Sequence, residues 1–387
     1  MHLYLFYILS IISLPVLKKV TQPPQVRFEA QTIDAGIGIG YGLAVGDVDG
    51  DGKPDILLAD KKQFVWYRNG DWKRFVMADS LTKHDNVCIA ARDIDGDGKV
   101  EVAVGAQWNP GETSNVQESG SVHYLIRPAD PTQLWKAVKL HHEPTVHRMQ
   151  WVKSGDKKYC LVVVPLHGRG NKDGEGEGVR ILSYQFPKNV YGNWPLDTIN
   201  KTMHLTHNFD VREDINTSKI YLAGKEGVAI LAGDFKPAQI RSQNRLAMAR
   251  GVGEVRVGKL NADSSFMAAI EPMHGDKVVV YPSGVSGEIL LDDNIKEGHA
   301  LAVADLLNIG SDQIVVGWRA GNKENKVGIK LYANKDEAGK EWESYWIDEN
   351  GMACEDLKVA DLNGDGKLDI IASGRSTHNL KIYWNKQ

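Results

Sequence analysis

One repeated segment constrains this chain more than any other feature. Three stretches align without gaps, and each is an apolar run, an acidic glycine loop and a second apolar run: GLAVGDVDGDGKPDILLAD, CIAARDIDGDGKVEVAVGA and LKVADLNGDGKLDIIASG. A fourth copy, ALAVADLLNIGSDQIVVGW, keeps both runs but loses the acidic loop. Three weaker copies keep the hydrophobic outline: MQWVKSGDKKYCLVVV, FDVREDINTSKIYLAG and VRVGKLNADSSFMAAI. Copies at intervals of roughly 45–60 residues have the spacing of propeller blades.

Each copy is followed by one or two further strand-like runs, such as QFVWYRN and WKRFVMA after the first. Four short antiparallel strands per unit make a propeller blade. The last copy has only three strands up to LKIYWNKQ, and the run VRFEAQTID stands alone ahead of the first copy. That lone strand would complete the last blade and remove an open sheet edge. We therefore expect an all-β fold: one seven-bladed β-propeller over residues 24–387, closed by an N-terminal strand.

Residues 1–22 are set apart from the propeller. The run LYLFYILSIISLPV is nearly all apolar and is soon followed by two lysines. It is too short for a comfortable membrane span and has the length of a signal-peptide core. We expect a signal peptide, with a short membrane anchor or a misassigned start as the alternatives. The protein is then secreted or periplasmic, or anchored at its N-terminus, without a stable membrane span.

Composition narrows the class of protein. Charged residues make up 25% and hydrophobic residues 42%, with a net charge of −4, as in a soluble globular protein. No basic run indicates a nucleic-acid footprint. Cys88, Cys160 and Cys354 all lie in apolar runs and are odd in number, so they predict small buried hydrophobes rather than a disulfide framework. We expect a monomer with no nucleic-acid partner.

The acidic loops follow the pattern D-x-[DN]-x-D-G-x-x-[DE] three times. Ca²⁺ takes six or more oxygen ligands, which alternating carboxylates in a tight loop supply, and glycine permits the turn. Flanking strands make these propeller calcium loops rather than EF-hands, whose loops lie between helices. A plain acidic turn is the alternative. The predicted ligands of structural Ca²⁺ are Asp47, Asp49, Asp51, Asp55, Asp93, Asp95, Asp97, Glu101, Asp361, Asn363, Asp365 and Asp369.

The opposite face of the propeller is rich in histidine and arginine. There, the loop before the first strand of each blade meets the loop after its second strand. A single histidine beside a strand ordinarily has a packing role, but several that converge on one axis indicate a site. Blade packing is the alternative for the tryptophans, and interblade ion pairs for Arg319 and Arg375. This face carries His84, Gln107, Trp108, His147, His167, Arg169, His204, His207, Lys225, Glu271, His274, His299, Trp318, Arg319 and Arg375.

The calcium-loop copies resemble the FG-GAP or VCBS-type repeats of integrin-like propellers, which serve many functions. More particular are HDNVCIAARDIDGDGKVEVAVGAQWNPGETSNVQESGSVHYLIRP, HEPTVHRMQW, PLHGRGNKDGEGEGVRI and EGHALAVADL. They look like the propeller of aldos-2-ulose dehydratases and of rhamnose–glucuronate lyases. Both groups perform elimination on a sugar at the axial face. The resemblance implies a catalytic His84 and an additional metal ion deep in the central funnel. The dehydratases carry a further C-terminal β-domain, whose absence from this sequence favours the lyase.

β-Elimination at a 4-linked glucuronic acid, as in plant-gum or arabinogalactan side chains, needs three parts. A cation neutralises the carboxylate beside C5, a base takes the C5 proton, and an acid protonates O4. Histidine suits proton transfer near neutral pH. We expect His84 as the base, with His147 or His207 as acid or metal ligand. The predicted substrate-binding residues, whose arginines would hold the carboxylate, are Trp108, His167, Arg169, His299, Trp318, Arg319 and Arg375.

Two other functions stay open. The same residues would serve dehydration or isomerisation of a keto-sugar, which needs no carboxylate clamp. A non-catalytic glycan-binding or adhesion propeller would bind an oligo- or polysaccharide and leave it unchanged. Glycoside hydrolysis is less favoured because it needs paired carboxylates, and Glu271 stands nearly alone on this face.

Overall fold

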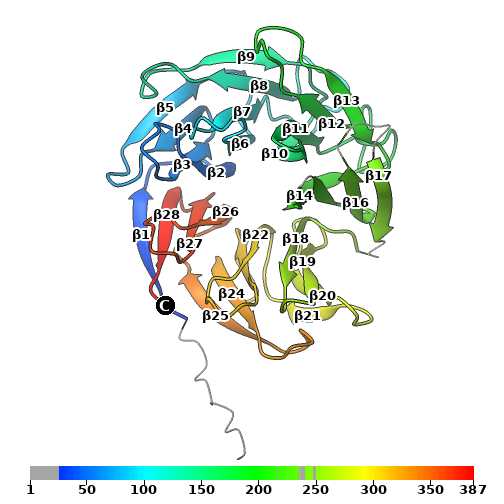
Figure 1. Cartoon of the computed structure of the whole chain (residues 1–387). Helices are drawn as coiled ribbons and strands as arrows, with labels where there is room; N and C mark the ends of the chain where they lie inside the picture. The colour runs from blue at the N-terminus through cyan, green and yellow to red at the C-terminus, as the bar shows by residue number, and fades with distance from the viewer. Residues whose placement is uncertain (1–25, 216, 234, 236–239, 247–249) are drawn as a thin grey trace, which may run out of the picture.

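The computed structural model describes residues 26–215, 217–233, 235, 240–246 and 250–387. The predicted signal peptide over residues 1–22 lies outside this part of the chain. Within the described residues, seven four-stranded antiparallel sheets stand around a central axis (Figure 1). The expectation of an all-β, seven-bladed propeller is confirmed.

The first strand of each sheet lies nearest the axis and the fourth lies at the outer edge (Figure 1). The first four blades are β2 (Gly42–Gly46), β3 (Asp55–Ala59), β4 (Gln63–Tyr67) and β5 (Arg74–Asp79); β6 (Cys88–Arg92), β7 (Glu101–Ala106), β8 (Ser121–Ile126) and β9 (Lys136–Leu140); β10 (Val146–Gly155), β11 (Lys158–Pro165), β12 (Ile181–Gln185) and β13 (Leu196–Asn200); and β14 (Thr206–Glu213), β15 (Ser218–Gly224), β16 (Gly227–Gly233) and β17 (Ile240–Leu246). The last three are β18 (Glu254–Lys259), β19 (Ser265–Glu271), β20 (Lys277–Pro282) and β21 (Ile289–Asp292); β22 (Gly298–Ala304), β23 (Gln313–Trp318), β24 (Gly328–Asn334) and β25 (Trp342–Glu349); and β26 (Cys354–Ala360), β27 (Asp369–Gly374), β28 (Asn379–Asn385) and β1 (Phe28–Asp34).

Hydrophobic cores fill the spaces between the blades. Strands such as β3 and β7 are buried along their whole length, which is why they read as continuous apolar runs. Among the described residues, seven clusters of buried side chains each join two neighbouring blades. In one of them Leu57 and Trp66 of blade one lie with Val102 and Val104 of blade two. Each blade therefore depends on both of its neighbours.

The N-terminal strand closes the ring, as predicted. β1 pairs antiparallel with β28 and becomes the outer strand of blade seven, so both ends of the propeller share one sheet. The link into blade one is fixed by the Asp60 carboxylate, which accepts hydrogen bonds from the backbone amides of Gly38, Ile39 and Gly40 at 2.8–3.0 Å.

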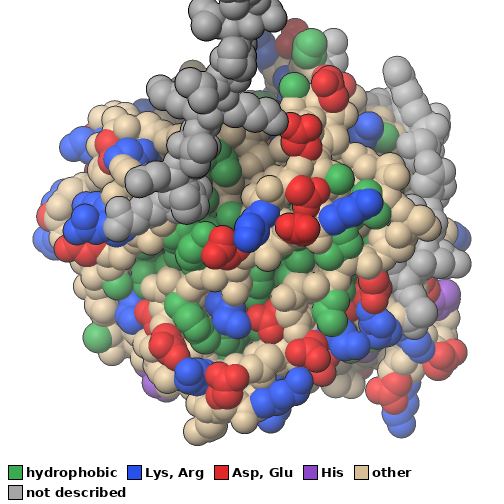
Figure 2. All heavy atoms as spheres, turned by 90° about the horizontal axis from the view of Figure 1, so that it is seen from below, with side chains coloured by type: hydrophobic (Ala, Val, Ile, Leu, Met, Phe, Trp, Pro, Cys, Tyr) green, Lys and Arg blue, Asp and Glu red, His purple; other side chains and the backbone are tan. Residues whose placement is uncertain are grey.

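The outer edge carries mixed charge. Figure 2 shows acidic and basic side chains interspersed with hydrophobic ones over the face that it displays. No helix among the described residues is long and apolar enough to span a membrane. Cys88, Cys160 and Cys354 are buried, as their apolar surroundings in the sequence predicted.

A channel runs along the axis between the innermost strands. It holds a cavity of about 460 Å³ lined by residues of all seven first strands. The loops that precede these strands open at one face, which we call the funnel face, because every first strand runs in the same direction. The acidic loops, which join first to second strands, lie at the opposite face.

Candidate functional site

Three histidines occupy the same position in three innermost strands. His147, His207 and His299 are each the second residue of their strand, β10, β14 and β22, and all are buried. Equivalent positions lie at the same depth in the channel, so the three rings meet. The ring centroids of His147 and His207 are 4.7 Å apart, and those of His207 and His299 are 5.0 Å apart.

Backbone carbonyls fix the tautomers of these imidazoles. His147 Nδ1 lies 2.8 Å from the carbonyl oxygen of His207, and His207 Nδ1 lies 3.1 Å from that of Gly253. His299 Nδ1 lies 2.6 Å from the carbonyl oxygen of Glu355. A carbonyl only accepts, so Nδ1 carries the proton and Nε2 keeps its lone pair in each ring. Such a ring can take a proton or a metal ion at Nε2 and has no proton to give there.

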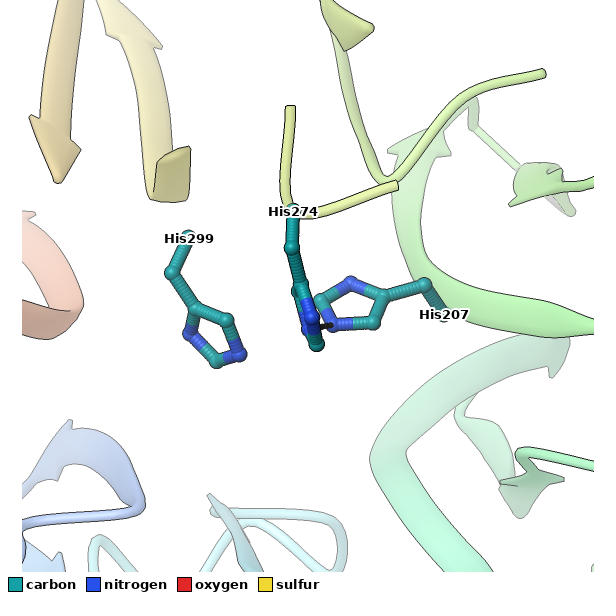
Figure 3. A group of neighbouring side chains, drawn as sticks. All are labelled: His207, His274 and His299. Carbon is teal, nitrogen blue, oxygen red and sulfur yellow. Dashed lines mark hydrogen bonds between the residues drawn. The ribbon is translucent and has the colours of Figure 1, made fainter. Parts of the chain in front are cut away.

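His274, which follows β19 in blade five, completes the histidine cluster (His147, His207, His274 and His299). Its Nε2 lies 2.7 Å from Nε2 of His207 (Figure 3). Ring nitrogens of His207, His274 and His299 all lie within 4.8 Å of one another. Imidazoles that converge in this way, two of them with Nδ1–H on a backbone carbonyl, fit a metal ion. An all-nitrogen donor set suits a divalent transition ion better than Ca²⁺.

Burial disfavours the charged form of the cluster histidines. Loss of hydration, with the charge of Arg148 nearby, holds the pKa of His147 well below its ordinary value. Loss of hydration also lowers the pKa of His207 and His299. His274 keeps an exposed surface at the open end of the cluster, and partial loss of hydration lowers its pKa as well. Neutral imidazole is the form that binds metal ions and accepts protons.

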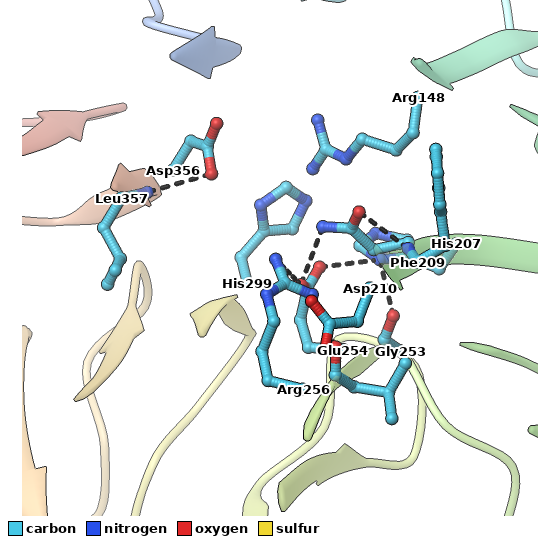
Figure 4. Close-up of polar contacts among 12 residues, drawn as sticks. Arg148, His207, Phe209, Asp210, Gly253, Glu254, Arg256, His299, Asp356 and Leu357 are labelled. Carbon is cyan, nitrogen blue, oxygen red and sulfur yellow. Dashed lines mark hydrogen bonds and ion pairs between the residues drawn. The ribbon is translucent and has the colours of Figure 1, made fainter. Parts of the chain in front are cut away.

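A carboxylate stands behind His207 (Figure 4). Glu254, the first residue of β18, is buried, and its Oε1 lies 3.1 Å from His207 Nδ1. Its Oε2 accepts a hydrogen bond from Asn208 at 2.7 Å and lies 3.4 Å from the Arg256 guanidinium. Burial alone would raise the pKa of Glu254, but contact with His207 and the charge of Arg256 outweigh it and lower the pKa to about 2. Glu254 is therefore an acidic group beside Nδ1 of His207, whose proton goes to the carbonyl of Gly253.

The wall of the funnel links blades one, two, three and seven. The indole of Trp108, half-buried, stacks on His147 with 5.1 Å between ring centroids and 27° between planes. Asp85 is bridged to Trp108 through the backbone and accepts a hydrogen bond from the Tyr41 hydroxyl at 3.2 Å. The Arg375 guanidinium lies 5.6 Å from the centre of the Tyr41 ring. Trp108 is thus an aromatic wall beside the histidine cluster.

The three arginines predicted to hold a substrate carboxylate are each paired with a carboxylate of the protein. Arg319 and Arg375 bind the two oxygens of the buried Glu355 at 2.8 and 2.9 Å. Arg169 donates two hydrogen bonds to Glu143, at 2.8 and 3.0 Å. The Arg319–Glu355 contact joins blades six and seven, so the alternative of an interblade ion pair describes it well.

His84 lies on the funnel face, apart from the histidine cluster. It is half-buried before β6, and its backbone N–H donates to the Gln107 side chain at 3.1 Å. Its imidazole has no hydrogen bond or ring contact among the described residues. His167 is also half-buried, and its Nδ1 is closed off without a hydrogen-bond partner in the described part of the chain.

Trp318 is a core residue. Its side chain is 0% exposed and packs in the apolar cluster between blades five and six. Its indole N–H donates to the carbonyl of Lys326 at 2.8 Å. A ring without an exposed face cannot stack on a sugar, so the prediction of a substrate-binding Trp318 is wrong and the packing alternative holds.

The three acidic loops share one hydrogen-bond pattern. In the first, Asp47 accepts hydrogen bonds from the amides of Gly50 and Gly52 at 2.6 and 2.7 Å. Asp93 and Asp361 do the same in the other two loops. The last carboxylate of each motif is buried and accepts a backbone amide of its own loop: Asp55, Glu101 and Asp369.

Two of these loops bring carboxylates together at one point. Oxygens of Asp47, Asp49 and Asp55 lie within 4.8 Å of one another, as do those of Asp93, Asp95 and Glu101. Burial raises the pKa of Asp55 and of Glu101 to about 7. Asp51 and Asp97 lie outside these groups and face cations, Lys53 at 3.7 Å and Arg127 at 3.4 Å. Burial disfavours the negative charge on these carboxylates, and their clustered oxygens therefore fit a hard cation.

Family comparisons agree with this architecture. The profile of the FG-GAP-like repeat matches residues 47–104, and that of the FG-GAP repeat matches residues 89–125. The chain carries FG-GAP repeats. The profile of the aldos-2-ulose dehydratase β-propeller domain matches residues 119–283, which include His147, His207 and His274. No curated protein sequence matches the chain.

Several solved structures share the fold. A chain of the mitotic checkpoint complex has a TM-score of 0.57 at 10% identity, with 99% of each chain covered. The exotype rhamnogalacturonan lyase YesX has a TM-score of 0.51 at 13% identity, covering 95% of this chain and 75% of YesX. The GH74 enzyme of Niastella koreensis has a TM-score of 0.51 at 13% identity, covering 91% of this chain and 44% of the enzyme. This propeller thus has carbohydrate-active enzymes among its structural neighbours, although identities this low show a shared fold alone.

Proposed function

We propose that this propeller is a carbohydrate lyase that performs β-elimination at a 4-linked glucuronic acid of an oligo- or polysaccharide. The observation that carries the proposal is the histidine cluster, whose ring nitrogens converge beside the indole of Trp108. Proton abstraction next to a carboxylate needs a neutral base and a positive site for the developing charge. Similarity of residues 119–283 to the aldos-2-ulose dehydratase propeller supports an elimination on a sugar.

In this proposal His84 takes the proton from C5. The electron pair of the C5–H bond forms the C4=C5 double bond, the C4–O4 bond breaks, and O4 takes a proton. One histidine can serve both steps when the C5 hydrogen and O4 lie on the same face of the sugar. His84 suits this role because its imidazole is uncommitted within the described chain. His147, whose Nε2 lone pair is free, is the second candidate for the base.

We further propose that His207, His274 and His299 hold the funnel metal. A divalent ion bound there would neutralise the substrate carboxylate as a Lewis acid. The protein contributes the orientation of its ligands, through the carbonyl of Gly253 behind His207 and the carbonyl of Glu355 behind His299. Elemental analysis of the purified protein should find about one transition ion per chain, and much less after His299→Ala.

Dehydration or isomerisation of a keto-sugar is the second candidate, because the dehydratase propeller profile covers the segment that holds three of the four cluster histidines. A keto-sugar polarises its own C–H bond and needs no carboxylate clamp. Turnover of keto-sugars with no turnover of uronides would favour this candidate.

The acidic loops are proposed to bind structural Ca²⁺, on the strength of their shared hydrogen-bond pattern and clustered carboxylates. Extracellular calcium modules work at affinities of about 10⁻⁴–10⁻³ M. That range fits the proposal that residues 1–22 direct export to a calcium-rich compartment.

A substrate panel tests the lyase proposal. The full chain, loaded with calcium and transition metal, is incubated with plant-gum, arabinogalactan and pectic side-chain glycans and with keto-sugars. A lyase gives ultraviolet absorbance from the C4=C5 bond conjugated to the carboxylate. Glycan binding without product would favour the adhesion propeller instead.

A further inference from the structure

Arg148 is a buried cation with unused hydrogen-bond donors. It is the third residue of β10, one position below His147, and its side chain is 8% exposed and lines the channel cavity. Its Nη1 donates to the carbonyl of Tyr41 at 3.3 Å. Its Nε and Nη2 are buried and find no partner among the described residues. A buried ion without partners is costly, so a residue kept in this state calls for an explanation.

The buried carboxylates Glu254 and Asp356 do not supply the missing partner. Oε2 of Glu254 is engaged by Asn208 and Arg256, and its Oε1 lies 3.1 Å from Nδ1 of His207. The oxygens of Asp356 accept the backbone amides of Leu43 and Leu357 at 2.8 and 2.9 Å, and Lys358 approaches them as well. No carboxylate oxygen of the described residues lies within hydrogen-bond distance of Nε or Nη2 of Arg148, so these two donors are left for a group from outside the described protein.

The free donors of Arg148 form one edge of its guanidinium. The N–H bonds of Nε and Nη2 run side by side, and this edge matches the two oxygens of a carboxylate. The side chain reaches from blade three towards Tyr41 in blade one, and its charge helps to lower the pKa of His299. A single hydrogen bond of 3.3 Å holds it, so the edge is free to turn towards an anion beside the histidine cluster.

We propose that Arg148 binds the carboxylate of the sugar acid through this edge. The inference rests on the proposed function and deepens it, because it assigns the carboxylate clamp to Arg148 and not to the arginines predicted from the sequence. Arg169, Arg319 and Arg375 already face protein carboxylates, whereas Arg148 faces none within hydrogen-bond distance. Arg148 thereby selects uronic acids over neutral sugars.

Calorimetric titration of the full, metal-loaded chain with glucuronate, glucose and inorganic phosphate tests this assignment. Wild type should bind glucuronate and not glucose at the same concentrations. Arg148→Met should weaken glucuronate binding about 10- to 100-fold, the effect of losing charge-assisted hydrogen bonds. Arg148→Lys, which keeps the charge and loses the edge, should fall between. Arg180→Met, which removes a half-exposed cation of blade three, should bind like wild type.

A stability measurement tests whether Arg148 serves only to stabilise the fold. Arg148→Met should melt at or above the wild-type temperature, because it removes an unsatisfied buried charge. A markedly lower melting temperature would assign Arg148 to the fold and overturn the proposal. Unchanged glucuronate affinity in Arg148→Met and Arg148→Lys would also overturn it, and so would phosphate binding equal to glucuronate binding, since the site would then be a general anion site. Binding through Arg148 without any elimination product would leave this inference standing and reject the lyase.

Discussion

Glu355 organises the rim of the funnel through three contacts. Its side chain, 2% exposed, binds Arg319 of blade six and Arg375 of its own blade. Its carbonyl accepts the Nδ1–H of His299 and so sets the tautomer of a cluster histidine. One buried acid therefore couples the charge balance of two arginines to the orientation of a candidate metal ligand.

We expect Glu355→Gln to lower the free energy of unfolding by about 3 kcal/mol, because removing one partner of a buried ion pair leaves the other uncompensated. Urea denaturation measures the change. The matched control is Glu297→Gln: Glu297 binds the same Arg319 at 2.9 Å but is 49% exposed, so its loss should cost about 0–1 kcal/mol. Equal effects of the two variants would contradict the role given to Glu355.

At this scale the sequence predicted which residues face the funnel and missed how they pair. Strand order alone places Arg319 and Arg375 on the correct face. Glu355, which pairs with both, comes from a different repeat than Arg319, and nothing in the local pattern around Arg319 marks it. The prediction of a substrate-binding Trp318 was wrong for a similar reason, because the burial of its side chain depends on the neighbouring blade. Arg148 was missed because a guanidinium without a partner is visible only in three dimensions.

The acidic loops are the clearest case of sequence dictating an element. The same aspartate, Asp47, Asp93 or Asp361, holds two glycine amides of its loop in all three copies. Glycine is needed at Gly52, where φ is +82°. The loops place their carboxylates at the face opposite the funnel, so calcium is expected to act on stability and not on the reaction.

Chelation of calcium should lower the melting temperature by about 5 °C, because an ion that binds only the folded state at 100 times its dissociation constant adds about 2.7 kcal/mol. Asp95→Ala should reproduce part of that loss while leaving turnover at saturating calcium nearly unchanged. Asp263→Ala, in the degenerate loop of blade five, should melt like wild type with and without calcium. A melting curve that chelation leaves unmoved would refute the calcium proposal.

Register between repeats was the signal that sequence reasoning left unused. The copies MQWV, FDVR and LAVA share a first apolar residue, and His147, His207 and His299 each stand two positions ahead of it. Equivalent positions of innermost strands meet on the axis, so this alignment predicts the cluster. His274 could not be placed in this way because it comes from the loop after β19, whose path no repeat register fixes.

The whole ring depends on closure by β1. Six residue pairs register β1 against β28, and the core between blades six and seven includes Phe28 among its flanking side chains. This architecture was predictable because seven hydrophobic outlines at blade spacing admit few other folds, and because an unpaired fourth strand had one open edge to fill.

A chain that begins at residue 36 should be less stable than one that begins at residue 24 by about 3–6 kcal/mol, at roughly 1 kcal/mol for each hydrogen bond lost. Denaturation in urea measures the difference, and a synthetic peptide of residues 26–35 should restore part of it. Equal stability of the two chains would contradict closure by β1.

We propose that the funnel breaks a uronide linkage by elimination, and one reaction in heavy-oxygen water tests this proposal. The metal-loaded full chain is given the glucuronate glycan selected from the panel, and products are followed by ultraviolet absorbance and mass spectrometry. We predict an unsaturated uronate that carries no heavy oxygen. His84→Ala should slow its formation by at least about 100-fold, as expected for loss of a proton-transfer group, while His141→Ala, at an exposed histidine outside the funnel, should react like wild type. A saturated product that contains heavy oxygen, or an unchanged glycan, would contradict the account.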